Sequence, residues 1–536
     1  MEVEKNITNN RGVNISSFFL SLFIVIPLFA LLLSVFKVDL NNFYYLWDNL
    51  LIDYSLNTIY LVLLTCFFSL IFGIFPAWFI STSKFKGRNL YDIILYLPLA
   101  IPTYIMAFTY SDILSYTGPI QSFARKHIPE ISNILNQDYL QIEVLAIIMG
   151  LALYPYIYTA CRISFSLVGS NYIDLSRNLG MSQMKTFFKI ILPISRVAIF
   201  SGLFLVIMEV LNEYGAVKYF GVNTFTSGIF RSWYSMQDVD TASLLAVSLF
   251  VIVVFFFFLE RYINSNYQFN YSANTNQESN FSLSYSRRLV VHLVCLIPII
   301  FGFLTPILFI IDNVINEFAR INFSKLIDLI VNTLSISLVS AIIIVLIALL
   351  FQFFRKVSKS RIVMICSDMI SLTYALPGAV VGLSLIILVT SFPNIINSNI
   401  FIGSFFLLIY AYSIRHMAVG ISPLKSSFEK HPNSYDDTGI NLGLTPFRLF
   451  KKIHLPINRS AILIAFLLCF IDIMKELPIT LILRPFNFDT LAVQTYQFAI
   501  EEMIPKSAVY SLTIVMIGSI LLIFLKKIVN KQINVS

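Results

Sequence analysis

The chain has 536 residues, of which 57% are hydrophobic, 15% aromatic and only 12% charged, and its formal net charge is +8. So high an apolar content excludes a soluble globular protein and indicates a membrane protein with many spans. The basic residues lie in short loops between apolar segments, so they predict no nucleic-acid binding and leave the lipid bilayer as the expected environment. The five cysteines include no CxxC pair, so we expect neither a disulfide framework nor a cysteine metal site.

Twelve apolar segments are long enough to cross a bilayer. The first six lie near residues 15–36, 57–80, 91–111, 143–161, 197–218 and 242–260. The other six lie near residues 289–311, 330–354, 369–391, 400–421, 460–483 and 507–525. The first segment lacks a small-residue cleavage site, so we interpret it as an uncleaved anchor. We therefore predict an all-α, polytopic membrane protein with about 12 transmembrane helices.

The distribution of lysine and arginine predicts which loops face the cytoplasm. The C-terminal end is basic, as are the loops at 81–90, 162–196, 355–361 and 422–459, whereas the intervening loops are neutral or acidic. Because every second loop agrees, we expect both termini on the cytoplasmic side of a multi-pass protein.

A polar segment separates two parts of similar length. Residues 262–286 are rich in Asn, Ser, Tyr and Gln, which predicts a flexible cytoplasmic linker. The linker divides the chain into a first half, 1–261, and a second half, 287–536, each with six predicted spans.

One stretch of the chain occurs twice. Residues 172–199 and 435–462 align without a gap at an offset of 263, with 14 of 28 positions identical. Because Gly, Pro and polar positions match in register, we infer an internal duplication and two homologous halves. Each copy predicts a helix that ends at a glycine, an N-cap serine or threonine, and a second helix ended by a Leu-Pro pair. The shared residues include Asp174, Gly180, Phe187, Leu192 and Pro193, and Asp437, Gly443, Phe450, Leu455 and Pro456.

This repeated pattern resembles the EAA loop of ABC importer permeases, the inner-membrane components of binding-protein-dependent transport systems. The usual Glu-Ala-Ala start is replaced by DLS at 174–176 and DTG at 437–439, while the acidic residue, the glycine and the Leu-Pro pair remain. The resemblance implies the type I importer transmembrane fold. It also implies that 172–188 and 435–451, with the shared residues named above, dock onto two copies of a cytoplasmic ATPase subunit.

The chain carries no phosphate-binding loop of its own. It has no GxxxxGK[ST] motif, so it is expected to rely on ATP used by partner subunits. We therefore predict a transport subunit that binds no cofactor and is not an enzyme.

Acidic residues occupy matching positions in the fifth span of each half. They are spaced i, i+4, so each pair shares one helical face: Glu209 and Glu213, and Asp472 and Glu476. Ionisable groups inside a span are costly and usually functional, and hard cations prefer oxygen ligands. We expect these four acids to line a substrate path and to bind a metal ion transiently. The alternative is that they form ion pairs with Lys475 and Lys218 or lie at the membrane surface.

Two strings after these spans resemble external segments of fused, two-half iron(III) permeases. They are YFGVNTFTSGIFRSWY at 219–234 and the KELP and RPF-x-F-x-T-LA strings within 475–493, and the resemblance extends over nearly the whole chain. It implies a permease of a bacterial inner membrane that imports Fe³⁺ by alternating access. A periplasmic substrate-binding protein is then expected to dock at Arg231, Trp233 and Arg484.

Other interpretations remain open at this point. The same fused architecture could import thiamine, a polyamine or another small solute, although the acid pairs argue against an anionic phosphonate. A secondary transporter driven by an ion gradient fits less well, because it would have no use for two ATPase-docking hairpins. A membrane-embedded enzyme is weaker still, because the spans contain no constellation with catalytic spacing.

Overall fold

The computed structural model describes residues 11–36, 38, 44, 47–130, 135–265, 281–282, 285–358, 360–391, 398–432 and 434–535. Most of the predicted linker at 262–286 therefore lies outside the described residues. The described chain is helical apart from two strands of two residues, β1 (Ser83–Lys84) and β2 (Phe281–Ser282). These strands pair in parallel, with Ser83 opposite Phe281 and Lys84 opposite Ser282.

The helices before β2, with their short π and 3-10 segments, follow the predicted spans of the first half. In chain order they are α2 (Arg11–Val35), η1 (Trp47–Leu51), α4 (Ile52–Thr82), α5 (Arg88–Ile94), η2 (Leu97–Ala100), α6 (Thr103–Leu114), α7 (Pro119–His127), α9 (Ile142–Asn178), α10 (Gln183–Thr186), η3 (Phe187–Ile191), α11 (Leu192–Ile194), α12 (Arg196–Asn212), α13 (Gly215–Tyr219), α14 (Phe225–Phe230), η4 (Arg231–Ser235) and α15 (Val239–Ser265).

The helices after β2 follow the same order. They are α16 (Tyr285–Ile299), η5 (Ile300–Leu304), α17 (Thr305–Glu317), η6 (Phe318–Arg320), α18 (Phe323–Val357), α19 (Arg361–Leu372), η7 (Thr373–Ala375), α20 (Gly378–Ser391), α21 (Ser398–Phe401), α22 (Phe405–Lys430), α23 (Ser434–Asn441), α24 (Pro446–Leu449), η8 (Phe450–His454), α25 (Leu455–Ile457), α26 (Arg459–Met474), α27 (Pro478–Leu483), α28 (Leu491–Ile500) and α29 (Ile504–Val535).

These helices confirm the all-α, polytopic fold. Among the described residues, eight helices are long and apolar enough to cross a membrane, or eleven if three bent helix pairs each count as one span. The shorter apolar helix α20 lies in the predicted span at 369–391. Helices suit these segments because a helix satisfies its own backbone hydrogen bonds, which lipid cannot do.

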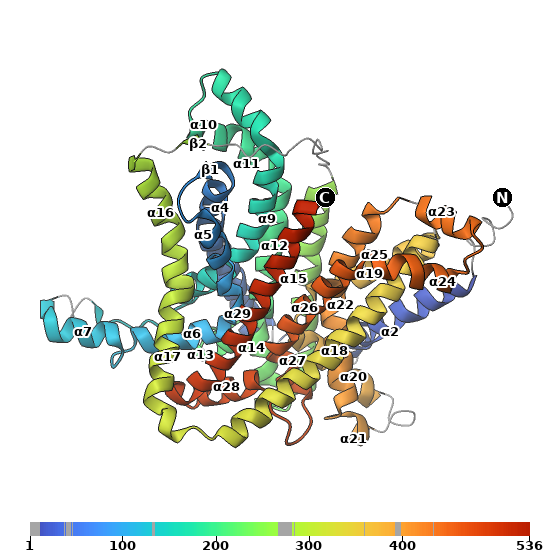
Figure 1. The fold of residues 1–536 in the computed structure, drawn as a ribbon. Coiled ribbons are helices and arrows are strands. Elements are labelled where there is room, and N and C mark those ends of the chain that lie inside the picture. The colour runs from blue at the N-terminus through green and yellow to red at the C-terminus, as the bar shows by residue number, and fades with distance from the viewer. Residues whose placement is uncertain are drawn as a thin grey trace.

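Figure 1 shows the arrangement of these helices. The two repeated hairpins, around α10–α11 and α23–α25, lie at one end of the molecule, where α2 also begins and α29 ends. The short helices α13, α14, α27 and α28 lie toward the opposite end. The placement agrees with hairpins that share one side of a membrane.

One pair of hydrogen bonds recurs in both halves. The backbone N–H of Phe225, at the start of α14, donates to Thr58 Oγ1 of α4 at 3.3 Å. The backbone N–H of Leu491, at the start of α28, donates to Thr333 Oγ1 of α18 at 2.9 Å. Each threonine belongs to an Asn-Thr dipeptide at the second predicted span of its half. The dipeptide therefore attaches α14 or α28 to that span.

The hairpins confirm the predicted glycine turns but not the predicted helix ends. Gly180 and Gly443 have φ values of 71° and 76°, a left-handed conformation that glycine adopts without strain. The following helix does not stop at the Leu-Pro pair, because η3 and η8 carry it through α11 and α25. It bends at Ser195 or Asn458, by 71° and 75°. Each proline directly follows a π-helical turn, in which the N–H of Leu192 or Leu455 bonds to the carbonyl five residues back, at Phe187 or Phe450.

Candidate functional site

The four predicted acids line one cavity of about 80 Å³. Glu209 lies near the end of α12 and Glu213 directly follows it, while Asp472 lies near the end of α26 and Glu476 follows it. The remaining wall comes from the η2–α6 junction and from α9, α22 and the start of α27. Segments from both predicted halves therefore meet at this cavity.

The cavity lies where helices are interrupted. Breaks separate η2 from α6 at 101–102, α12 from α13 at 213–214, and α26 from α27 at 475–477. An interrupted helix leaves backbone polar groups unpaired, which a membrane protein tolerates only inside protein or beside a polar cavity. Such breaks near the middle of the bilayer are where transporters commonly hold their substrates.

The second acid of each pair caps the helix that follows it. Glu213 accepts a hydrogen bond from the backbone N–H of Ala216 at 3.0 Å, and Glu476 accepts one from Ile479 at 3.4 Å. The hydroxyl of Thr103 also donates to Glu213. Both side chains are buried, and these bonds hold their carboxyl groups at fixed points of the cavity wall.

Two basic side chains of the second half neutralise two of the acids. Arg415 Nε lies 3.3 Å from Glu476 Oε2, and Lys475 Nζ lies 3.0 Å from Asp472 Oδ1. Arg415 also donates to the backbone carbonyl of Leu376 at 2.6 Å, which fixes the guanidinium against η7. The ion pair with Lys475, considered above as an alternative role for these acids, is therefore present, whereas Lys218 is exposed on α13.

Glu209 is the acid with neither a helix-capping hydrogen bond nor an ion pair among the described residues. Its carboxylate accepts a hydrogen bond from the Tyr156 hydroxyl at 3.4 Å, and no basic side chain among the described residues forms an ion pair with it. The structure also brings no three His, Cys, Asp or Glu side chains together as a metal site within its described ranges. The acids are thus spread along the wall, and their role toward a metal ion stays a prediction.

Aromatic side chains close the cavity on the side of α13 and α28. Tyr104 and Tyr214 line the cavity, and the Tyr214 ring stacks on Phe230 with a centroid distance of 3.7 Å. The hydroxyl of Tyr496, on α28, donates to the Tyr214 hydroxyl at 3.1 Å. This contact joins the two halves, and we call Tyr104, Tyr214, Phe230 and Tyr496 the aromatic layer.

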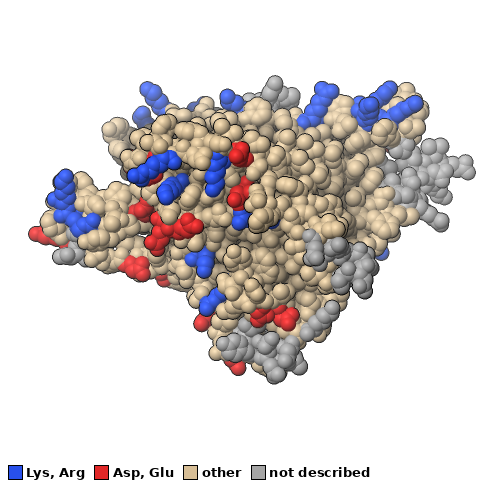
Figure 2. All heavy atoms as spheres, turned by 90° about the horizontal axis from the view of Figure 1, so that it is seen from below, with Lys and Arg blue, Asp and Glu red and all other residues tan. Residues whose placement is uncertain are grey.

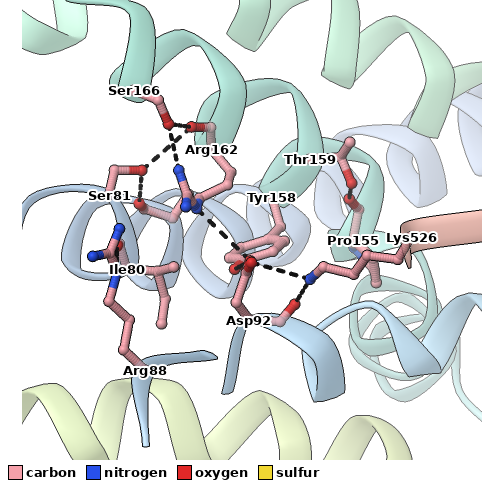
Figure 3. A network of polar contacts seen from close by, with 11 residues as sticks. Ile80, Ser81, Arg88, Asp92, Pro155, Tyr158, Thr159, Arg162, Ser166 and Lys526 are labelled. Atoms are coloured by element: carbon pink, nitrogen blue, oxygen red, sulfur yellow. Dashed lines mark hydrogen bonds and ion pairs between the residues drawn. The ribbon is translucent and has the colours of Figure 1, made fainter. Parts of the chain in front are cut away.

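A polar network joins α5, α9 and α29 (Figure 3). Asp92 of α5 lies at its centre and accepts a hydrogen bond from the Tyr158 hydroxyl at 2.5 Å. Lys526 Nζ, on α29, lies 3.2 Å from Asp92 Oδ2, and Arg162 Nε, on α9, lies 3.7 Å from Oδ1. Lys526 also lies over the ring of Tyr96 at 4.0 Å. The network ties the last helix of the chain to two helices of the first half.

The predicted coupling residues of the hairpins lie partly inside the protein. Phe187 is 1% exposed and packs against Trp78 at a ring distance of 5.0 Å, and Phe450 packs against Phe353 at the same distance. Phe187 and Phe450 therefore seat the hairpins on their own halves. Exposed apolar side chains within the predicted docking ranges 172–188 and 435–451, beyond the ten shared residues named above, include Leu179, Met184, Phe188, Leu442 and Phe447.

The acidic positions of the hairpins add one contact that the sequence did not indicate. Asp437 is exposed, while Asp436 beside it forms an ion pair with the buried His454, whose Nε2 lies 2.8 Å from Oδ1. The side chain of Asp174 lies outside the described residues. The repeat could not reveal this contact, because the first copy has Ile173 and Ile191 at the corresponding positions.

The three residues predicted to receive a binding protein lie near the α13–α28 end of the molecule. Arg231 is exposed, Trp233 is half-buried, and Arg484 forms an ion pair with Asp489. Figure 2 views the molecule from below and shows a largely uncharged face on which acidic and basic side chains are both present. The structure does not test docking, which stays a prediction.

Residues 69–267 match the family described as "Binding-protein-dependent transport system inner membrane component". The chain is 25% identical over 476 residues to the Fe(3+)-transport system permease protein FbpB 2 of Haemophilus influenzae, a match that covers 88% of this chain and 89% of the relative. It is also 25% identical over 212 residues to the sulfate transport system permease protein CysT of Salmonella typhimurium, covering 39% of this chain and 73% of the relative.

Proposed function

Because this chain is an inner membrane component of a binding-protein-dependent transport system, we propose that it forms the pathway of an ATP-driven importer for ferric iron. It is a transport subunit and not an enzyme. The Fe(3+)-transport relative matches both halves of the chain, whereas the CysT match spans 39% of it. This full-length similarity supports iron as the cargo.

The observation that carries the proposal is the meeting of four carboxyl groups in one cavity. Arg415 and Lys475 also line the cavity, so the ionised lining has a formal charge of 4 × (−1) + 2 × (+1) = −2. A negative site inside a membrane attracts a hard cation, which prefers oxygen ligands. Because the carboxyl groups are spread out, each holds the cation weakly enough to release it to the next.

Transport by alternating access assigns a role to each end of the molecule. The hairpins at 172–188 and 435–451 dock onto two ATPase subunits in the cytoplasm, and both termini lie on that side. ATP binding favours one arrangement of the ATPase pair, and the bends at Ser195 and Asn458 pass this preference to α12 and α26, which carry the acids. A binding protein docks at Arg231, Trp233 and Arg484 and delivers iron once the aromatic layer opens.

The test is uptake of labelled ferric iron into proteoliposomes that contain this chain and its ATPase, with ATP inside and the binding protein outside. Glu209→Gln keeps the shape of the side chain but removes a charge that neither a basic residue nor a capping N–H holds among the described residues. Uptake should fall about tenfold or more, because the lost carboxylate interacts with the passing cation. Glu501→Gln is the matched control, since Glu501 is exposed outside the cavity.

Each outcome has a distinct meaning. Uptake by the control with loss in Glu209→Gln supports both the cargo and the path. Equal uptake by both variants would reject the cavity as the path while keeping iron as the cargo. ATP-dependent uptake of thiamine or a polyamine without iron uptake would reject iron and keep the importer.

A further inference from the structure

A second hollow, on the hairpin side of the molecule, is lined by basic residues. It has a volume of about 980 Å³ and is formed by the segment 84–90 together with Arg288 and His292 of α16. Its lining includes Lys84, Lys86, Arg88 and Arg288, and no Asp or Glu lines it among the described residues. We call this hollow the basic groove.

Contacts between segments far apart in the sequence build the basic groove. The parallel pairing of β1 with β2 places Lys84 opposite Ser282, just before α16. The hydroxyl of Tyr91 lies 2.9 Å from His292 Nδ1, and the ring of Phe85 packs edge-on against His292 at 5.5 Å. The groove is therefore a folded feature and not a chance gathering of lysines on a loose loop.

The cations of the groove are held outward. Lys84, Lys86 and Arg288 are exposed. Arg88 donates through Nε to the backbone carbonyl of Ile80 at 2.7 Å (Figure 3), which orients its guanidinium. Lys84, Lys86 and Arg288 form no ion pair among the described residues, and three exposed cations in one lining form a site for an anion.

The groove lies at the boundary of the apolar surface. Arg288 begins one candidate span and Arg88 begins one of the bent pairs. Directly beside them, the apolar side chains of α5 and α16 are between 50% and 61% exposed: Leu90, Leu289, Val290 and Leu293. Cations beside an exposed apolar strip are complementary to a lipid-like molecule, which has a negatively charged head and hydrocarbon chains.

The corresponding loop of the second half is built differently. Arg355 Nη2 lies 3.2 Å from Glu429 Oε1, and Lys356 donates to the backbone carbonyl of His431 at 2.9 Å. These cations are already occupied by the protein. Lys84 and Lys86 of the first-half loop form no such contact within the described part of the chain, so these two side chains can meet an external anion.

We propose that the basic groove binds the phosphate of an anionic phospholipid headgroup, with the acyl chains lying on the exposed strip of α5 and α16. Basic pockets beside membrane helices on the cytoplasmic side are suited to such headgroups. A free phosphate ion shares the head chemistry but gains nothing from the apolar strip. An acidic surface of a partner protein fits less well, because such a protein would need a groove that lies clear of the membrane boundary.

The test is native mass spectrometry of the full chain, delipidated in detergent and titrated with phosphatidylglycerol. The variant Lys84→Gln/Lys86→Gln should lower the affinity of the tightest site about thirtyfold, because each basic residue near an anionic headgroup contributes about fivefold. Lys84→Arg/Lys86→Arg should stay within about threefold of wild type, which shows that the charge matters and that the fold is intact. The control Arg355→Gln/Lys356→Gln removes the same charge elsewhere and should leave the affinity unchanged.

Three results would overturn the proposal. The first is equal affinity for phosphatidylglycerol and for zwitterionic phosphatidylcholine. The second is displacement of phosphatidylglycerol by millimolar inorganic phosphate, which would make the groove a site for a free anion. The third is loss of the co-purified ATPase in Lys84→Gln/Lys86→Gln with unchanged lipid binding, which would make it a protein interface. None of these results depends on the cargo of the transporter.

Discussion

Replacing Asp92 by asparagine should destabilise the protein more than replacing its cationic partner Lys526. The carboxylate faces two cations, Lys526 at 3.2 Å and Arg162 at 3.7 Å. The side chains of Asp92, Lys526 and Arg162 are 20%, 9% and 22% exposed. Asp92→Asn leaves two poorly solvated cations without a counter-charge, and breaking such a pair costs about 3–5 kcal/mol. Partial exposure places the expected loss at the lower end, about 3 kcal/mol.

Lys526→Met removes one cation but leaves Asp92 paired with Arg162. The methionine also keeps an apolar stem against Tyr96, so the loss is limited to one ion pair and one cation–π contact. We expect about 1–2 kcal/mol. The double variant Asp92→Asn/Lys526→Met leaves a single uncompensated cation, Arg162, and should therefore be no less stable than Asp92→Asn alone.

The assay is unfolding by sodium dodecyl sulfate in mixed micelles, followed by tryptophan fluorescence. The order of midpoints should be wild type, Lys526→Met, the double variant and Asp92→Asn, from most to least stable. The reasoning is refuted if Lys526→Met unfolds as early as Asp92→Asn, or if the two losses simply add in the double variant.

Three further predictions concern packing, coupling and closure. Gly150→Ala should unfold earlier than the matched helical control Gly518→Ala in the same assay. A Cβ at Gly150 meets Phe68 Cβ at 2.7 Å, whereas one at Gly518 meets nothing closer than 3.4 Å. Overpacking of this kind costs about 1–3 kcal/mol. Phe447→Glu should reduce the amount of co-purified ATPase about tenfold without changing the yield of the chain, because it removes an exposed apolar side chain of the hairpin. Normal co-purification would contradict docking at this hairpin. Tyr496→Phe should cost about 1 kcal/mol in unfolding by removing its hydrogen bond to Tyr214, and no shift would show that this bond does not hold the aromatic layer closed.

The sequence predicted the spans and the duplicated hairpins well for physical reasons. An apolar run of sufficient length has few alternatives to a membrane helix, so the segments near 57–80 and 330–354 coincide with α4 and α18. The left-handed turns at Gly180 and Gly443 were equally predictable, because their sequence signal is local. The four acids met in one cavity because the repeat placed them at equivalent positions.

The partners of those acids were harder to predict. Arg415 reaches Glu476 from α22, 61 positions earlier in the chain, and no local pattern encodes that contact. The available signal was the presence of an arginine inside the apolar segment 400–421. The burial of Phe187 was likewise invisible, because it depends on Trp78 of a helix distant in the sequence. The continuation of the helix through the Leu-Pro pairs depends on π-helical segments that have no distinct composition.

The charged residues that line the cavity are divided unevenly between the two halves. This division is possible because the two homologous halves belong to a single chain. Among the described residues, every basic residue of the lining belongs to the second half, while the first half contributes Glu209 and Glu213 without a cation. A pair of identical first halves would give the lining a formal charge of 2 × (−2) = −4, and a pair of identical second halves would give 2 × (−2 + 2) = 0. The intermediate value of −2 is available to unlike halves alone. Joining the halves covalently guarantees that each molecule has one of each, so the symmetry of the ancestral repeat is broken at the cavity in every copy.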